Sequence, residues 1–167
     1  MLPEPRVGDS TLYDDDILLW SERQAAAIRS LARLRDIPNE LDIVNVAEEI
    51  ESVGRSELAA VKSHIRLIFV HLLRIVVAPK SDAARHWRGE IVAFHSEMVG
   101  RYTPSMRQRI DIDELWRSAR EQVLLDPEGG EEQLVASLPE KAPFTIDELL
   151  AERIDGFELT KRLRPFD

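Results

Sequence analysis

The sequence predicts an all-α fold, a single-domain helical bundle of four to six helices with one long central helix. Glycine is scarce, at 7 of 167 residues, and the strong helix formers Ala, Leu, Arg and Glu are plentiful. Apolar residues recur at helical spacing along most of the chain, and sustained period-2 alternation is absent. A chain of this length suits one domain with a sizeable core.

The chain is expected to have three parts. Residues 1–11 carry Pro3, Pro5 and Gly8 and form a flexible N-terminal lead. Residues 12–151 form the helical bundle domain. Residues 152–167, which end in LTKRLRPFD, form a basic C-terminal tail.

The first long helix follows the stretch YDDD. Asp14 or a neighbour suits the N-cap, and acids suit the positive end of a helix. The helix is expected to continue to about Arg35, before Pro38 and Asn39. Its apolar stripe is predicted to comprise Ile17, Trp20, Gln24, Ile28, Leu31 and Leu34.

The central helix is predicted over residues 43–78, capped by Asp42 or by an Asn45–Glu48 pair and closed by Pro79. Thirty-six helical residues span about 54 Å, whereas a globule of this chain length has a radius of gyration of about 15 Å. We therefore expect the helix either to kink near Gly54 or to project into a partner.

The remaining helices are shorter. Ser81 is predicted to cap a helix over residues 82–102, and a short helix after Thr103 precedes another over residues 113–125. The segment DPEGGEE is predicted to be a turn or loop. Thr145 and Glu148 form a capping-box pattern ahead of LLAERI, and Gly156 is expected to end that helix.

Three polar residues lie in the apolar stripe of the central helix. At about 100° per residue, Glu57, His64 and His71 all fall within about 20° of Val46. Buried polar groups must find partners or cost about 1–3 kcal/mol each. Two hypotheses follow. The histidines either hydrogen-bond structurally, to the Trp20 or Trp87 indoles or to neighbouring carboxylates, or they face a pocket.

Metal and cofactor chemistry finds little support. The chain has no cysteine, so thiolate nucleophiles and Cys-based metal sites are excluded. Seven residues rise about 10.5 Å along a helix, too far for two ligands of one ion. A metal would need ligands from another helix, such as His86 or His95. No spacing fixes a nucleophile and no Gly-rich phosphate loop occurs, so we expect no cofactor, and enzymatic activity stays an alternative.

Charge argues against general nucleic-acid affinity, because the net charge is −9. Residues 62–109, however, hold nine Lys and Arg against three acids. This basic segment keeps nucleic-acid binding open as an alternative. It also allows pairing with the acidic flanks, within the fold or between copies.

We expect a cytoplasmic protein that does not span a membrane. The most apolar window, residues 67–78, has only twelve residues, whereas a span needs about twenty. The start MLPEPRVGDS lacks the basic and apolar regions of a signal peptide.

Several stretches, taken in order, resemble one prokaryotic family. They are YDDDILLWSERQAAAIRS, LDIVNVAEEIESVGRSE, HLLRI, HWRGEI, TPSM and LPEKAPFTIDELL. The chain is similar, over about residues 12–151, to the helical proteins catalogued as domain of unknown function family 29. Arg74 and Ile75 stand where that family usually has a Lys and an aromatic residue.

The resemblance implies an all-helical bacterial protein and no established activity. Positions of the family motif match Trp20, Glu49, Glu57, His71 and Trp87. With the stripe, this gives a candidate pocket of Glu57, His64, His71, Trp87 and Glu49.

We therefore expect an interaction or regulatory module that acts through a protein partner or as a homo-oligomer. The alternatives are a small-ligand binder or hydrolase-type enzyme around His71, and a nucleic-acid binder through residues 62–109.

Overall fold

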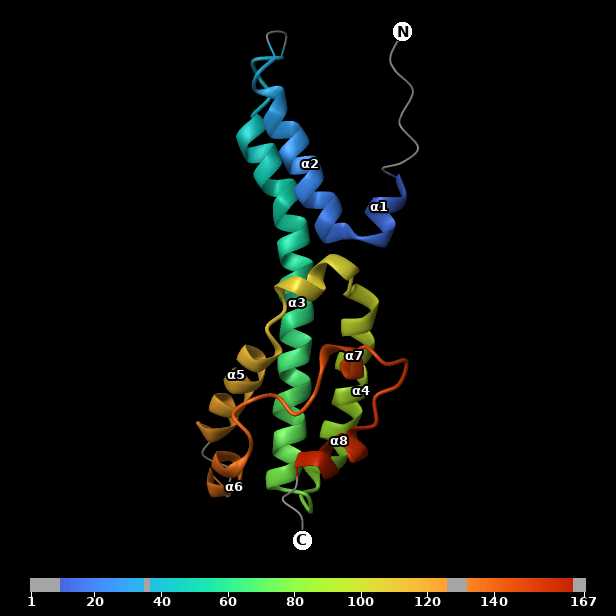
Figure 1. Cartoon of the computed structure of the whole chain (residues 1–167), viewed down its shortest axis with the longest axis vertical. Coiled ribbons are helices and arrows are strands. Elements are labelled where there is room, and N and C mark those ends of the chain that lie inside the picture. The colour runs from blue at the N-terminus through green and yellow to red at the C-terminus, as the bar shows by residue number, and fades with distance from the viewer. Residues whose placement is uncertain (1–9, 35–36, 126–131, 164–167) are drawn as a thin grey trace. The chain divides into compact units, whose positions relative to one another are not determined.

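The computed structural model describes residues 10–34, 37–125 and 132–163 (Figure 1). All regular structure in these ranges is helical, with α-helices α1–α8 and one 3-10 helix, η1. The all-α class is confirmed. So is the long helix α3, Ile43–Val77, whose bounds agree with the predicted 43–78 to within one residue. Four helices have 13 residues or more, and short elements make up the rest.

The chain forms two compact units. Unit 1 contains residues 1–60 and 102–109, with α1 (Ser10–Asp15), α2 (Ile17–Leu31), the first half of α3 and η1 (Pro104–Arg109). Unit 2 contains residues 61–101 and 110–167. It holds the second half of α3, α4 (Ala83–Arg101), α5 (Ile112–Leu124), α6 (Glu132–Ser137), α7 (Ile146–Leu149) and α8 (Gly156–Leu163).

In unit 1, α2 packs against the first half of α3 through small residues. A Cβ atom on Gly54 would lie 2.2 Å from the Ser21 hydroxyl oxygen and 2.9 Å from the Leu18 Cα. The backbones approach this closely because position 54 has no side chain. Helix α3 continues past Gly54, so the glycine serves close packing and does not end the helix.

The predicted apolar stripe of the first helix is wrong. The buried side chains of α2 are Leu18, Ser21 and Ala25, whereas Trp20 and Ile28 are only half-buried and Leu34 is exposed. The face of α2 that meets Gly54 carries Leu18 together with the small residues Ser21 and Ala25, and a stripe drawn only from large apolar residues misses the two small ones. The helix also ends at Leu31, earlier than the predicted Arg35.

Unit 2 contains most of the apolar core. Phe69 of α3 meets the Trp116 ring of α5 edge-on at 5.4 Å and stacks on Phe144 at 5.9 Å. All three rings are buried. The Trp116 indole donates to the Pro139 carbonyl at 2.9 Å, so its one polar atom is satisfied.

Several predicted caps are confirmed. The Asp42 carboxylate accepts from the Asn45 backbone at 3.1 Å, and the Ser81 hydroxyl accepts from the Ala83 backbone at 3.2 Å. Thr145 and Glu148 form the predicted capping box.

The C-terminal prediction needs correction. Helix α7 ends at Leu149, and Gly156 begins α8 inside the segment expected to be a basic tail. Asp155 accepts from the backbone of Phe157 and Glu158, which starts α8 there. Of the predicted flexible lead, residues 1–11, the last two residues belong to α1 and the first nine lie outside the described residues. Most of the DPEGGEE turn also lies outside them.

Candidate functional site

His71 is the most enclosed of the predicted site residues. It lies on α3 in unit 2 and is only 7% exposed. Its Nδ1 atom lies 2.8 Å from the Leu67 carbonyl oxygen, and its Nε2 atom lies 2.7 Å from a Glu90 carboxylate oxygen on α4. Of the structural partners proposed from the sequence, the neighbouring carboxylate is the one that the structure provides.

The two contacts of the His71 ring restrict where its hydrogens can lie. A backbone carbonyl only accepts, so His71 Nδ1 must carry a hydrogen. The Nε2 atom of a neutral ring would then be an acceptor facing a carboxylate, which also accepts. A hydrogen bond at the 2.7 Å contact therefore needs a hydrogen on one of these two atoms.

Glu90 connects His71 to the surface. Its second carboxylate oxygen lies 3.3 Å from Nε2 of His86, whose side chain is 74% exposed. Phe94, one turn further along α4, contacts His71 edge-on at 5.3 Å and stacks on His64 at 6.1 Å. The His64 Nδ1 atom is buried without a hydrogen-bond partner. This constellation comprises His71, Glu90, His86, Phe94 and His64.

The other predicted pocket residues differ in exposure and belong to both units. Glu49 is exposed and Glu57 half-buried, both in unit 1, whereas Trp87 is half-buried on α4 in unit 2. His64 and His71 share a neighbour, because the Phe94 ring packs against both of their rings. Surface pockets of about 430 and 360 Å³ in unit 2 have other linings.

A second polar centre, in unit 1, was not predicted. Asp16 is 6% exposed, and it caps α2 by accepting from the Leu19 backbone at 3.1 Å. It also accepts from the Thr103 hydroxyl at 3.0 Å and from the Ser105 backbone and hydroxyl at 2.9 and 2.7 Å. Burial alone would raise the pKa of Asp16, but these hydrogen bonds outweigh it and lower the pKa below the ordinary value of 3.8.

This centre joins two stretches that the sequence analysis treated separately. Asp16 ends YDDD, and Thr103 and Ser105 belong to TPSM, almost ninety residues later. A signal was present, since YDDD supplies an N-cap acid and TPSM supplies hydroxyl donors. Their pairing depends on the tertiary fold, and no local spacing encodes it.

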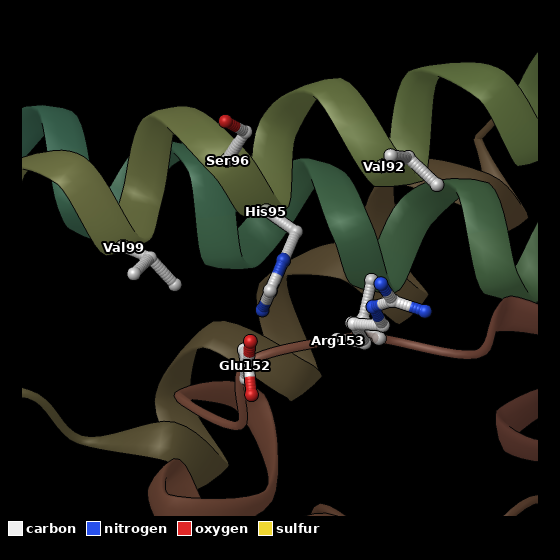
Figure 2. A pocket seen from close by; sticks show the side chains of 7 residues that line it. Val92, His95, Ser96, Val99, Glu152 and Arg153 are labelled. Carbon is white, nitrogen blue, oxygen red and sulfur yellow. The ribbon is translucent and has the colours of Figure 1, made fainter.

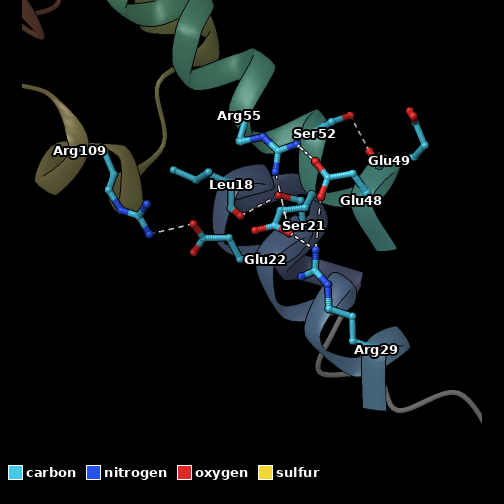
Figure 3. A network of polar contacts seen from close by, with 10 residues as sticks. Leu18, Ser21, Glu22, Arg29, Glu48, Glu49, Ser52, Arg55 and Arg109 are labelled. Carbon is cyan, nitrogen blue, oxygen red and sulfur yellow. Dashed lines mark hydrogen bonds and ion pairs between the residues drawn. The ribbon is translucent and has the colours of Figure 1, made fainter. Parts of the chain in front are cut away.

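Charged side chains link α2 to α3 on the surface of unit 1 (Figure 3). Arg29 pairs with Glu51 and, at 3.5 Å, with Glu48, which also pairs with Arg55. The hydrogen bond from Arg29 is the main cause of the lowered pKa of Glu51. These pairs are solvent-exposed, so they fix orientation more than they stabilise.

Neither centre arranges its side chains as a metal site would. Among the residues that the structure describes, no three His, Asp or Glu side chains are grouped so as to hold an ion. In those same ranges, no helix has the length and apolar character needed to cross a bilayer.

The family model described as "Domain of unknown function DUF29" matches residues 12–154. The chain belongs to the DUF29 family. A crystallised alpha-helical protein of unknown function from Rhodospirillum rubrum ATCC 11170 is 35% identical to it, with a TM-score of 0.79. That likeness covers 92% of this chain and 98% of the other. No curated protein matches the chain.

Membership confirms the resemblance drawn from the sequence. Both Asp16 and the His71–Glu90 pair fall inside the residues that the DUF29 model matches. Neither the family description nor the similar structure supplies an activity, so function must be argued from the residues themselves.

Proposed function

We propose that this DUF29 chain is a helical interaction module of the bacterial cytoplasm that self-associates through unit 1. The contact surface is an apolar stripe on the first half of α3. Exposed apolar residues near the α2–α3 connection extend it.

Unit 1 exposes more large apolar side chains than its size explains. Six of the ten exposed large hydrophobics in the described ranges belong to it, although it has well under half of the chain. They are Tyr13, Leu34, Leu41, Val44, Val46 and Val53. Clustered exposed apolar residues mark interaction surfaces more often than isolated ones do.

The stripe has the spacing of a helix–helix seam. Val46 and Val53 are one heptad apart and are 37% and 44% exposed. The same face of α3 carries His71 and Ile75 further along, where it is buried within unit 2. An apolar face that is covered in one stretch and bare in another is the single observation that carries the proposal.

A second copy is the partner that fits this face. Helix α2 covers one side of α3 in unit 1, so two such hairpins can bury both bare faces in a four-helix arrangement. Twofold pairing places the same surface on both sides, and it is the commonest oligomeric symmetry. The stripe is short and Glu49 borders it, which favours a weak dimer with a dissociation constant of about 1–100 μM.

Sedimentation equilibrium over a range of protein concentrations tests this. The wild-type chain should pass from monomer to dimer, and Val53→Glu should keep it monomeric. Leu125→Glu is the matched control, because Leu125 is an exposed aliphatic residue of unit 2. A wild-type chain that stays monomeric at about 1 mM, ten times the upper end of the expected range, would refute the proposal.

Nucleic-acid binding through residues 62–109 has weaker support. Arg109 pairs with Glu22 at 2.8 Å, Arg101 lies 3.7 Å from Glu97, and Arg66 donates to Gln122. Cations engaged with protein groups are less available to phosphates. A gel shift with duplex DNA at low salt would favour nucleic-acid binding over self-association as the function.

A further inference from the structure

A surface pocket of about 430 Å³ lies between α4 and the chain that connects α7 to α8 (Figure 2). Its volume is within the range of small-molecule sites. Val92, Val99 and Ile154 supply the apolar part of the lining, and the polar part comes from His95, Ser96, Glu152 and Arg153. All of these residues belong to unit 2.

His95 contributes a buried nitrogen that lacks a hydrogen-bond partner to this pocket. The residue is only 6% exposed, and its Nε2 atom is buried with no hydrogen-bond partner. Figure 2 shows its ring extending from α4 toward Glu152. Buried polar atoms in folded proteins almost always have a partner, so the unpaired nitrogen indicates a group that completes the site.

The two charged residues of the pocket are available for a ligand. Glu152 and Arg153 are both exposed, and no hydrogen bond or ion pair to either is found in the described part of the chain. Val92 and Val99 are 56% and 40% exposed, so the pocket offers bare aliphatic surface beside an acid and a base.

We propose that this pocket binds a small zwitterion with a branched aliphatic body, of the branched-chain α-amino acid class. The ligand ammonium donates to His95 Nε2, which accepts when the neutral ring carries its hydrogen on Nδ1, and to the Glu152 carboxylate. The Arg153 guanidinium donates to the ligand carboxylate. The aliphatic body covers Val92 and Val99.

This site shares no residue with the apolar stripe of unit 1. Ligand binding and self-association can therefore be measured separately, and failure of one leaves the other standing.

L-Leucine is the first probe, titrated into the full chain and followed by amide and His ring NMR shifts. Shifts of the His95 ring and of Glu152 and Arg153 should saturate below about 10 mM, the limit of weak specific binding. At ten times the dissociation constant, the midpoint of thermal unfolding should rise by about 3 °C. 3-Methylbutylamine and 4-methylpentanoate each lack one charged group, and each should bind at least about tenfold more weakly.

Single substitutions test which side chains contact the ligand. Glu152→Gln and Arg153→Gln change exposed side chains, and each should weaken L-leucine binding about tenfold. Arg117→Gln and Glu121→Gln, at the 360 Å³ pocket, are matched controls that should leave binding unchanged. The proposal is overturned if L-leucine causes no saturable shift, if either single-charge analogue binds equally well, or if the controls and the site variants behave alike. No saturable shift would mean that water alone satisfies His95.

Discussion

The two halves of α3 are parts of one helix, yet their surroundings differ. Over residues 43–60 only Ala47 and Gly54 are buried, whereas eleven residues are buried over 61–77. From residue 68 to residue 77 every position except Arg74 is buried, as in a helix enclosed by neighbours. The first half is covered mainly on the side that faces α2. Helix formation therefore does not indicate how much of a helix will be enclosed.

The two units also differ in the contacts that stabilise the interior of each. Unit 2 has stacked and edge-on aromatic rings at its centre. Unit 1 has a close contact of small residues at Gly54 and a buried carboxylate at Asp16. The stability gained from apolar burial does not depend on pH. The stability contributed by a carboxylate that accepts several hydrogen bonds falls when the carboxylate is protonated. Unit 1 should therefore respond to acid and unit 2 to loss of apolar volume.

The largest effect is expected from Phe69→Ala in unit 2. Removing this fully buried ring leaves a cavity beside Trp116 and Phe144 and should cost about 3–5 kcal/mol of unfolding free energy. Leu18→Ala is the counterpart in unit 1 and should cost less, about 2–3 kcal/mol. Urea unfolding of both variants gives the values. A larger loss from Leu18→Ala would contradict the contrast between the units.

Asp16→Ala should cost about 2–4 kcal/mol, because it removes the cap of α2 and leaves buried donors of Thr103 and Ser105 unpaired. The pKa of Asp16 is lower in the folded chain than in the unfolded one. Its stabilising contribution is therefore complete above the ordinary pKa and is lost as pH falls through the folded value.

Asp16→Asn removes the negative charge but keeps a side-chain oxygen that can cap α2, so it measures the contribution of the charge alone. The difference in unfolding free energy between wild type and this variant should be larger at pH 7 than at pH 3. Equal differences at both pH values would show that the ionised carboxylate adds nothing.

Gly54→Ala should destabilise the chain by about 1–3 kcal/mol, because the new methyl group meets the Leu18 backbone at 2.9 Å. Gly89 is the matched control, since it lies on α4 with nothing within 4 Å of an added Cβ. Gly89→Ala should stabilise by about 0.5–1 kcal/mol through helix propensity. Circular dichroism melts of both variants will show opposite shifts if the close approach of α2 to α3 is correct.

The smallest effect is expected at the His71–Glu90 pair. His71→Gln should cost about 1–2 kcal/mol, because it removes a hydrogen bond between α3 and a carboxylate that is still partly solvated. A double-mutant cycle with Glu90→Gln measures the coupling between the two residues. A coupling near zero would mean that the contact only fills space.

Local features of this chain were predictable from sequence. The bounds of α3 follow from an unbroken helical pattern between Asp42 and Pro79, and the caps at Asp42, Ser81 and Thr145 need only residues two or three positions away. The error at Gly156 has the same origin. A glycine marks a helix boundary, but its residue type does not say on which side the helix lies.

The candidate site was predictable only in part. Placing His71 in the interior required the periodicity of α3 alone, and the structure confirms that position. Its partner Glu90 lies on the next helix, and Asp16 meets hydroxyl groups almost ninety residues away. Neither pairing leaves a trace in local spacing.

The sequence by itself determined the all-helical class, the length of α3 and where several helices begin, because helix hydrogen bonds and caps join residues close along the chain. The tertiary structure alone decided which stretch of α3 is covered, which acid meets His71 and which nitrogen of His95 has no hydrogen-bond partner. Those outcomes depend on the shapes of distant segments that pack together, and a repeat of about 3.6 residues carries no information about them.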